Sequence, residues 1–173
     1  VKIGVPRKQI FISGHSCGGL LTLMLLAAHP EKVGGGISYM QACFGKLSTK
    51  YKVKKVGPEE AMLNFAKKYP GPAELRERQI NNIKQSNNVP VLAFTHPKDK
   101  WEGLLSDWLE EVPGVKRIVI SEDYTINGKS CVVKGDNWQE NISARKNPGH
   151  EMNQGLCFQY YNPDILNFIK SKI

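Results

Sequence analysis

The motif Gly14-His-Ser-Cys-Gly18 has the spacing that displays a nucleophilic serine. An apolar run, Gln9 to Ser13, enters the motif, and a helical run, Leu20 to Ala28, leaves it. A serine at such a strand-to-helix turn sits in a tight backbone, and the glycines two residues to either side avoid collisions of Cβ atoms with the neighbouring strand and helix. We therefore predict that Ser16 attacks a carbonyl carbon. The alternative is a glycine-rich turn whose serine only caps the helix.

The stretch from Val5 to Gly19 resembles the elbow region of α/β-hydrolases, especially dienelactone-hydrolase-like and prolyl-oligopeptidase-like members. The resemblance covers most of the chain and implies an α/β fold with a mostly parallel sheet flanked by helices. It also implies a serine hydrolase that cleaves a carboxylic ester through an acyl-enzyme, with a Ser-Asp-His triad in that chain order. Two alternatives stay open: a serine peptidase of prolyl-oligopeptidase type, and a non-catalytic binding protein on a degenerate hydrolase fold.

The acid of this resemblance is expected just after a later strand. Val89–Thr95 reads as a buried strand and leads into the loop that holds Asp99, which we predict to be the acid. His96 stands where the family often has glycine. The alternative role of Asp99 is that of a turn or helix-capping residue. Glu102 falls within a helical pattern over residues 101–111 and is expected on a solvated face.

The histidine is expected on a loop before the terminal helix. His150 fits this place, because it lies in the loop Asn147–Met152 ahead of the apolar helix Pro163–Ile173. There it is predicted to be the general base that accepts the serine proton. Structural roles beside or away from the site are expected for the remaining histidines, His15, His29 and His96.

The backbone N–H of Cys17 is the expected first donor to an oxyanion, because it belongs to the residue after the nucleophile. The Cys17 side chain is expected to pack. In the resembled fold the second donor comes from a loop upstream of the elbow. We therefore expect the chain to be the C-terminal part of a larger hydrolase without its N-terminal strands, and to associate with that portion; a chain that is really this short would need a partner to cover its sheet edge.

The other cysteines suggest no metal chemistry. No two of the four cysteines have Cys-x-x-Cys spacing, so neither a metal nor a cofactor is expected. Cys131 and Cys157 flank the His150 loop, where either a disulfide in an exported protein or two free thiols would be consistent with the sequence.

Composition indicates an ordinary globular domain, since 40% hydrophobic residues in a chain of 173 suffice for one core. The longest apolar run, Gly18–Ala28, is too short to span a bilayer. The formal net charge is +8, and five lysines fall within residues 46–55. This run is interpreted as a solvated loop rather than a nucleic-acid site, because only Tyr51 interleaves it. The expected partner is a small-molecule ester, with no nucleic acid and no membrane span.

One domain over residues 1–173 is the simplest organisation, with a helical excursion at about 40–88 and a β-excursion at about 121–148. The first is predicted as a loop over 40–58 followed by helices over 59–69 and 73–85, separated by Pro70-Gly-Pro72. The second contains a hairpin signal at residues 126–129. Candidates for a substrate-facing wall, with core packing as the alternative, are Met40, Phe44, Met62 and Phe65.

Overall fold

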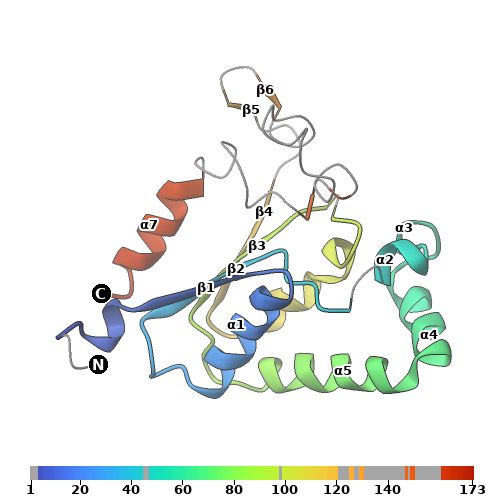
Figure 1. The fold of residues 1–173 in the computed structure, drawn as a ribbon, viewed down its shortest axis with the longest axis horizontal. Helices are drawn as coiled ribbons and strands as arrows, with labels where there is room; N and C mark the ends of the chain where they lie inside the picture. Colours follow the sequence, from blue (N-terminus) through green and yellow to red (C-terminus); the bar gives the residue numbers. More distant parts are fainter. Residues whose placement is uncertain are drawn as a thin grey trace.

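The computed structural model describes residues 4–44, 47–97, 99–120, 125–126, 129–130, 147, 149–150 and 161–173. Four parallel strands form its main sheet in the order β1-β2-β3-β4 (Figure 1). They are β1 (Phe11–His15), β2 (Gly35–Tyr39), β3 (Val91–Thr95) and β4 (Val115–Val119). Parallel neighbours need crossover connections, and helices supply them here. The predicted α/β fold with a parallel sheet flanked by helices is confirmed.

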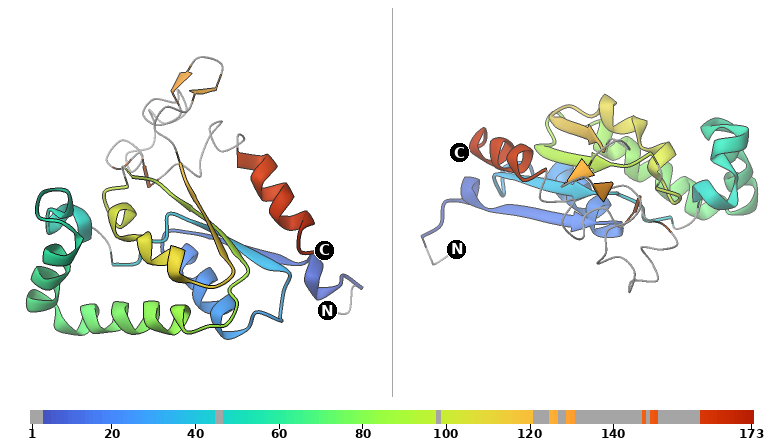
Figure 2. Two further views of the ribbon diagram at one scale, coloured as in Figure 1. Left: turned by 180° about the vertical axis from the view of Figure 1, so that it is seen from behind. Right: turned by 90° about the horizontal axis from the view of Figure 1, so that it is seen from above.

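Both faces of the sheet are covered. On one face Leu92 and Phe94 pack with the C-terminal helix α7 (Asn162–Lys170) through Phe168. On the other face Val91 and Ala93 pack with α1 (Cys17–Ala28), the C-terminal part of α5 (Pro70–Lys84) and Leu109. Because successive side chains of a strand point to opposite faces and both faces are covered, β3 is buried at every residue, and all but its last residue, Thr95, are apolar. Figure 2 shows the sheet from behind and from above.

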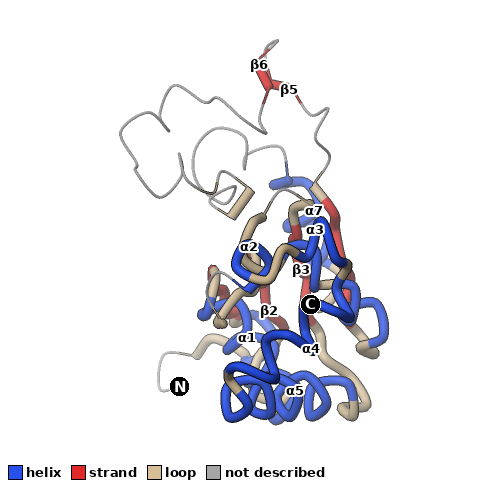
Figure 3. Tube along the Cα trace, turned by 90° about the vertical axis from the view of Figure 1, so that its right-hand side faces the viewer, coloured by secondary structure: helices blue, strands red, loops and turns tan. Residues whose placement is uncertain are grey.

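Four helices lie in the described part of the segment between β2 and β3. They are α2 (Leu47–Lys50), α3 (Val53–Val56), α4 (Pro58–Lys68) and α5. In Figure 3, α2, α3 and α4 face the viewer in front of the strands. The prediction of a loop over residues 40–58 is wrong for α2 and α3. Their short lysine-rich sequences lack helical periodicity, and burial of Leu47 and Val53 in a cluster with Phe65 stabilises them instead.

The Pro70-Gly-Pro72 segment does not separate two helices as predicted. It forms the first turn of α5, and only Tyr69 lies between α4 and α5. Proline fits the first helical position, because its N–H would have no acceptor within the helix there and its φ is already helical. The two helices consequently meet at a corner (Figure 1).

The helix predicted over residues 101–111 is also wrong. Two short 3-10 helices replace it, η2 (Gly103–Leu105) and η3 (Asp107–Glu111). A Cβ atom at Gly103 would overlap the backbone oxygen of His96, so the chain passes tightly beneath the loop after β3 at this point.

Three smaller features complete the fold. A 3-10 helix, η1 (Arg7–Gln9), precedes β1, and β5 (Thr125–Ile126) pairs antiparallel with β6 (Lys129–Ser130). Cys131, Cys157 and most of the segment 121–148 lie outside the described residues. Within the described part of the chain, no helix combines the length and apolar character needed to cross a membrane.

Candidate active site

Ser16 occupies the sharp turn between β1 and α1. Its φ of 59° and ψ of −123° lie in a region that costs a non-glycine residue on the order of 1–3 kcal/mol. Its backbone N–H donates to the carbonyl oxygen of Tyr39 on β2 at 2.9 Å. The tight elbow predicted from the motif is therefore present.

The glycines of the elbow differ in how closely they are approached. A Cβ atom at Gly14 would overlap the carbonyl of Gly18, as predicted. At Gly18 itself the prediction of a collision is wrong, because no atom of the described residues outside its chain neighbours and the backbone of α1 lies within 4 Å of the Cβ position. The close approach is at Gly19, where a Cβ atom would lie 2.9 Å from both the Ser38 Oγ and the Tyr39 carbonyl oxygen.

The three residues chosen as nucleophile, base and acid lie in hydrogen-bond contact. The Nε2 atom of His150 is 2.9 Å from the Ser16 Oγ, and the Nδ1 atom of His150 is 2.9 Å from the Asp99 Oδ2. His150 and Asp99 are almost fully buried, at 0% and 2% exposed. Ser16 and Asp99 follow β1 and β3, whose carboxyl ends meet at one edge of the parallel sheet. Ligands of open α/β sheets bind at this edge.

The acceptors around the imidazole fix which nitrogen carries its proton. An ionised carboxylate only accepts hydrogen bonds, so the Nδ1–H of His150 must donate to Asp99. In the neutral ring Nε2 is then the acceptor, and it faces the Ser16 hydroxyl. That hydroxyl also lies 3.0 Å from the carbonyl oxygen of Ala42. Because the hydroxyl has one proton and two acceptors, it donates to Nε2 when His150 is neutral and to Ala42 when Nε2 is protonated.

Asp99 has two partners that the sequence did not reveal. Its Oδ1 accepts from the Asn147 side-chain amide and from the Trp101 backbone N–H, each at 2.9 Å. The amide oxygen of Asn147 accepts in turn from the Lys100 N–H at 2.8 Å, which fixes the orientation of that amide. The Asp99 carboxylate is thus held on both oxygens. The only sequence signal for Asn147 was its place three residues before His150.

Two rings enclose the imidazole of His150. The Trp101 ring centroid lies 4.1 Å away and that of His15 lies 4.7 Å away. The Nε2 atom of His15 is 2.7 Å from the His150 carbonyl oxygen, and a carbonyl only accepts, so His15 is protonated at Nε2. These contacts agree with the structural role expected for His15. The contact of Trp101 was not anticipated, although an aromatic residue two positions after the acid was a visible signal.

Residues 41–44, the loop after β2, lie against the elbow. The Ala42 N–H donates to the Ser16 carbonyl oxygen at 3.3 Å, and a disulfide joins Cys17 to Cys43. The expectation of a packed Cys17 side chain is wrong, because this residue is exposed and its sulfur is bonded across to the loop. Cys17 is also the first residue of α1, where an N–H has no acceptor within the helix.

Glu102 is buried and binds the loop of residues 41–44, so the solvated position predicted for it is wrong. It is 6% exposed, accepts from the Phe44 N–H at 2.9 Å and lies 3.3 Å from the Nε of Arg76 on α5. Burial raises the pKa of Glu102, while Arg76 and the backbone N–H of Phe44 act to lower it. A buried carboxylate needs such partners, because unpaired charge is costly inside a protein. An ion pair thus ties α5 to the loop that contacts Ser16.

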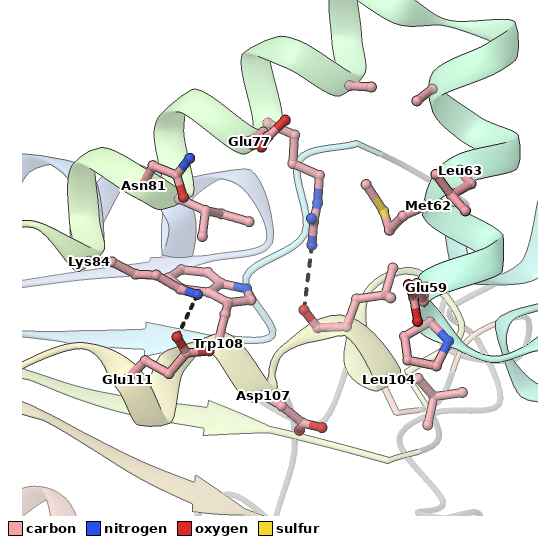
Figure 4. A pocket seen from close by; sticks show the side chains of 16 residues that line it. Glu59, Met62, Leu63, Glu77, Asn81, Lys84, Leu104, Asp107, Trp108 and Glu111 are labelled. Carbon is pink, nitrogen blue, oxygen red and sulfur yellow. Dashed lines mark hydrogen bonds and ion pairs between the residues drawn. The ribbon is translucent and has the colours of Figure 1, made fainter.

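Two hollows flank α4. The first, called the acidic groove, has a volume of about 800 Å³ between α4, α5 and η3, and contains none of Ser16, Asp99 and His150 (Figure 4). Its apolar floor includes Met62, Ile80 and Trp108. The acids on its wall are Glu59, Glu77, Asp107 and Glu111.

The second hollow, called the aromatic cavity, has a volume of about 430 Å³. Its walls are Phe44, Leu47, Lys50, Tyr51, Phe65, Tyr69 and Pro72. Of the four wall candidates from the sequence, Phe44 and Phe65 line this cavity and Met62 lines the acidic groove. Met40 instead packs in the core against α7 and is 2% exposed.

Comparison with known proteins gives distant structural likenesses only. No protein-family model matches the chain, and no curated protein matches it. The structure is similar to a thioesterase domain from the curacin biosynthetic pathway, with a TM-score of 0.41, 14% identity and coverage of 68% of this chain and 60% of that one. It is also similar to a serine hydrolase from the polyaromatic-hydrocarbon-degrading bacterium Cycloclasticus zankles, with a TM-score of 0.37, 17% identity and coverage of 66% and 56%. The chain spans less than two thirds of either protein, and at these TM-scores neither likeness bears on its activity.

Proposed function

We propose that the chain belongs to a serine hydrolase that cleaves a carboxylic ester through an acyl-enzyme, with Ser16, His150 and Asp99 as its catalytic residues. The observation that carries the proposal is the hydrogen-bond chain from Ser16 through His150 to Asp99, with both links at 2.9 Å. A serine hydroxyl is a poor nucleophile by itself and needs an adjacent base that a third group orients. This cluster supplies that base and that group.

The proposed reaction begins when Ser16 attacks the ester carbonyl carbon and His150 takes the hydroxyl proton. Asp99 stabilises the imidazolium that forms, and His150 then gives the proton to the leaving alcohol. Water repeats the cycle on the acyl-enzyme and releases the acid. The backbone N–H of Cys17 is the proposed first donor to the oxyanion, because it follows the nucleophile at the start of α1.

The test is labelling of the full-length native protein with a fluorophosphonate probe, followed by mass spectrometry of the modified peptide. We expect the adduct on Ser16 and its loss in Ser16→Ala. Ser13→Ala is the matched control, since Ser13 is an exposed serine on β1 three residues away and should leave labelling unchanged. A folded protein that takes up no probe would favour the non-catalytic alternative.

The peptidase alternative is tested on matched substrates. We expect turnover of an ester and none of the amide of the same acyl group. Enzymatic turnover of the amide that is lost in Ser16→Ala would replace the esterase assignment by a peptidase, while leaving the three catalytic residues as proposed.

A further inference from the structure

We propose that the aromatic cavity beside α4 binds an organic anion with an apolar, ring-containing body. In the proposed hydrolase this anion is part of the substrate, so the substrate role, though not the binding itself, rests on the proposed function. The volume of about 430 Å³ falls within the range of about 300–1,000 Å³ typical of small-molecule sites.

The walls of the cavity suit an aromatic or bulky apolar group. Phe65 contacts both tyrosines of the lining, with ring centroids 5.5 Å from Tyr51 and 5.8 Å from Tyr69. Such edge-on and tilted arrangements leave ring faces and edges available to a further ring. Leu47 and Pro72 add aliphatic surface, and none of the described residues that line the cavity is acidic.

A positive charge lies at the exposed side of the cavity. The Lys50 ammonium donates to the Tyr69 hydroxyl at 2.7 Å and lies 4.8 Å from the centre of the Tyr69 ring. The Lys68 ammonium lies 5.7 Å from the same ring. The hydrogen bond to the Tyr69 hydroxyl raises the pKa of Lys50, because it favours the ammonium form. Lys50 lines the cavity, so a carboxylate on the ligand would meet its ammonium while the apolar body meets the rings.

The residues that follow Lys50 in the sequence also carry positive charge. Lys52 directly precedes α3, and Lys54 and Lys55 lie on it, so the helix that follows Lys50 is itself positively charged. A concentration of one charge attracts ligands of the opposite charge. Amphipathic anions are the class that satisfies both the charge and the rings.

The cavity is connected to the proposed nucleophile through its Phe44 wall. Phe44 lies two residues after Ala42, whose carbonyl oxygen is 3.0 Å from the Ser16 Oγ. Two residues span at most about 7 Å, so one wall of the cavity and the carbonyl that contacts the serine belong to the same short piece of loop. This proximity favours a substrate group over a remote effector.

The binding test uses phenylbutyrate and its uncharged counterpart phenylbutanol, titrated by calorimetry into the full-length native protein carrying Ser16→Ala. We expect the acid to bind more tightly than the alcohol. Lys50→Met should weaken binding of the acid by about threefold to fivefold, the effect expected for one ion pair near the surface, and leave the alcohol unchanged. Lys8→Met is the control, since this exposed lysine lies on η1, outside the lysine run, and does not line the cavity. Equal binding of acid and alcohol, or equal effects of the two lysine variants, would overturn the proposal.

Folding and substrate role are checked separately. Phe65→Leu keeps an apolar residue at the buried site and should weaken both ligands, and its melting temperature shows whether it is folded. In the unsubstituted protein, phenylbutyrate should inhibit ester turnover competitively; binding without competition would overturn the substrate role. Because the titrations use Ser16→Ala, they give their answer even if the protein hydrolyses nothing. Conversely, a fluorophosphonate adduct on Ser16 without phenylbutyrate binding would contradict this inference and still support the proposed function.

Discussion

The cluster of Ser16, His150 and Asp99, called the triad cluster below, and the helical excursion are held together by different forces. In the triad cluster, each polar atom of His150 and Asp99 named above has a specific partner within 3.0 Å, and both residues are buried. The excursion α2–α5 rests on apolar packing around Phe65 and on the Arg76–Glu102 ion pair. Changes of single atoms should therefore affect activity most in the triad cluster, while changes of side-chain volume and charge should affect stability most in the excursion.

The largest effect is expected from one atom of the triad cluster. In Asp99→Asn the donors Asn147 and the Trp101 N–H retain the amide oxygen, so the amide NH2 faces Nδ1 of His150. The imidazole then loses the acceptor that fixes its Nδ1–H tautomer. We expect kcat for ester hydrolysis to fall about 10⁴-fold while the protein stays folded. Asp107→Asn is the control, because that side chain is 85% exposed and should leave kcat unchanged. An unchanged rate in Asp99→Asn would move the acid to another residue.

A smaller effect on activity, but the largest on stability, is expected at the link between the two regions. Arg76→Met leaves the Glu102 carboxylate buried without its cation, and loss of one member of a buried pair costs about 3–5 kcal/mol of the free energy of unfolding. Adding Glu102→Leu removes the stranded charge and should recover most of that stability. Chemical denaturation measures both steps.

Variants of Arg76 and Glu102 also test whether this ion pair positions the loop of residues 41–44 beside Ser16 or only stabilises the fold. In the double variant with Glu102→Leu the Phe44 N–H has no acceptor, whereas Glu102→Gln in the same Arg76→Met background keeps one. If the link positions the loop beside Ser16, fluorophosphonate labels the leucine variant more slowly than the glutamine variant at equal stability. Equal labelling rates would reduce Arg76 and Glu102 to a purely structural role.

The smallest expected effect is a dependence on pH. Burial raises the pKa of Glu102 above its ordinary value of 4.5. The folded state then binds this proton more tightly, so the contribution of Glu102 to stability is full below about pH 4.5 and decreases as the pH rises through the folded-state pKa. The difference in unfolding free energy between the native protein and the Arg76→Met, Glu102→Leu variant should fall from acid to neutral pH. Urea titrations at several pH values measure it; a difference that grows with pH would contradict the assignment.

The sequence predicted the sheet and the elbow because each rests on a local rule. A strand, a glycine-flanked serine and an apolar helix follow one another in a fixed order, and chain order then directed attention to Asp99 and His150, whose catalytic roles remain predictions. Glu102 was misjudged because its burial depends on Arg76, a residue 26 positions earlier that periodicity does not connect to it. Asn147 and the Cys17–Cys43 disulfide were missed for the same reason, since their partners are distant in sequence. Pro70 was misjudged because proline both ends helices and begins them.

The left-handed backbone of Ser16 also limits the course of evolution at this position. Positive φ is a severe outlier for β-branched residues, so a change of Ser16 to threonine would replace one hydroxyl by another and still disturb the turn. Glycine and cysteine avoid that branching, but the first has no nucleophile and the second brings a thiol next to an existing disulfide. The turn at this position is consequently expected to tolerate only residues that are unbranched at Cβ.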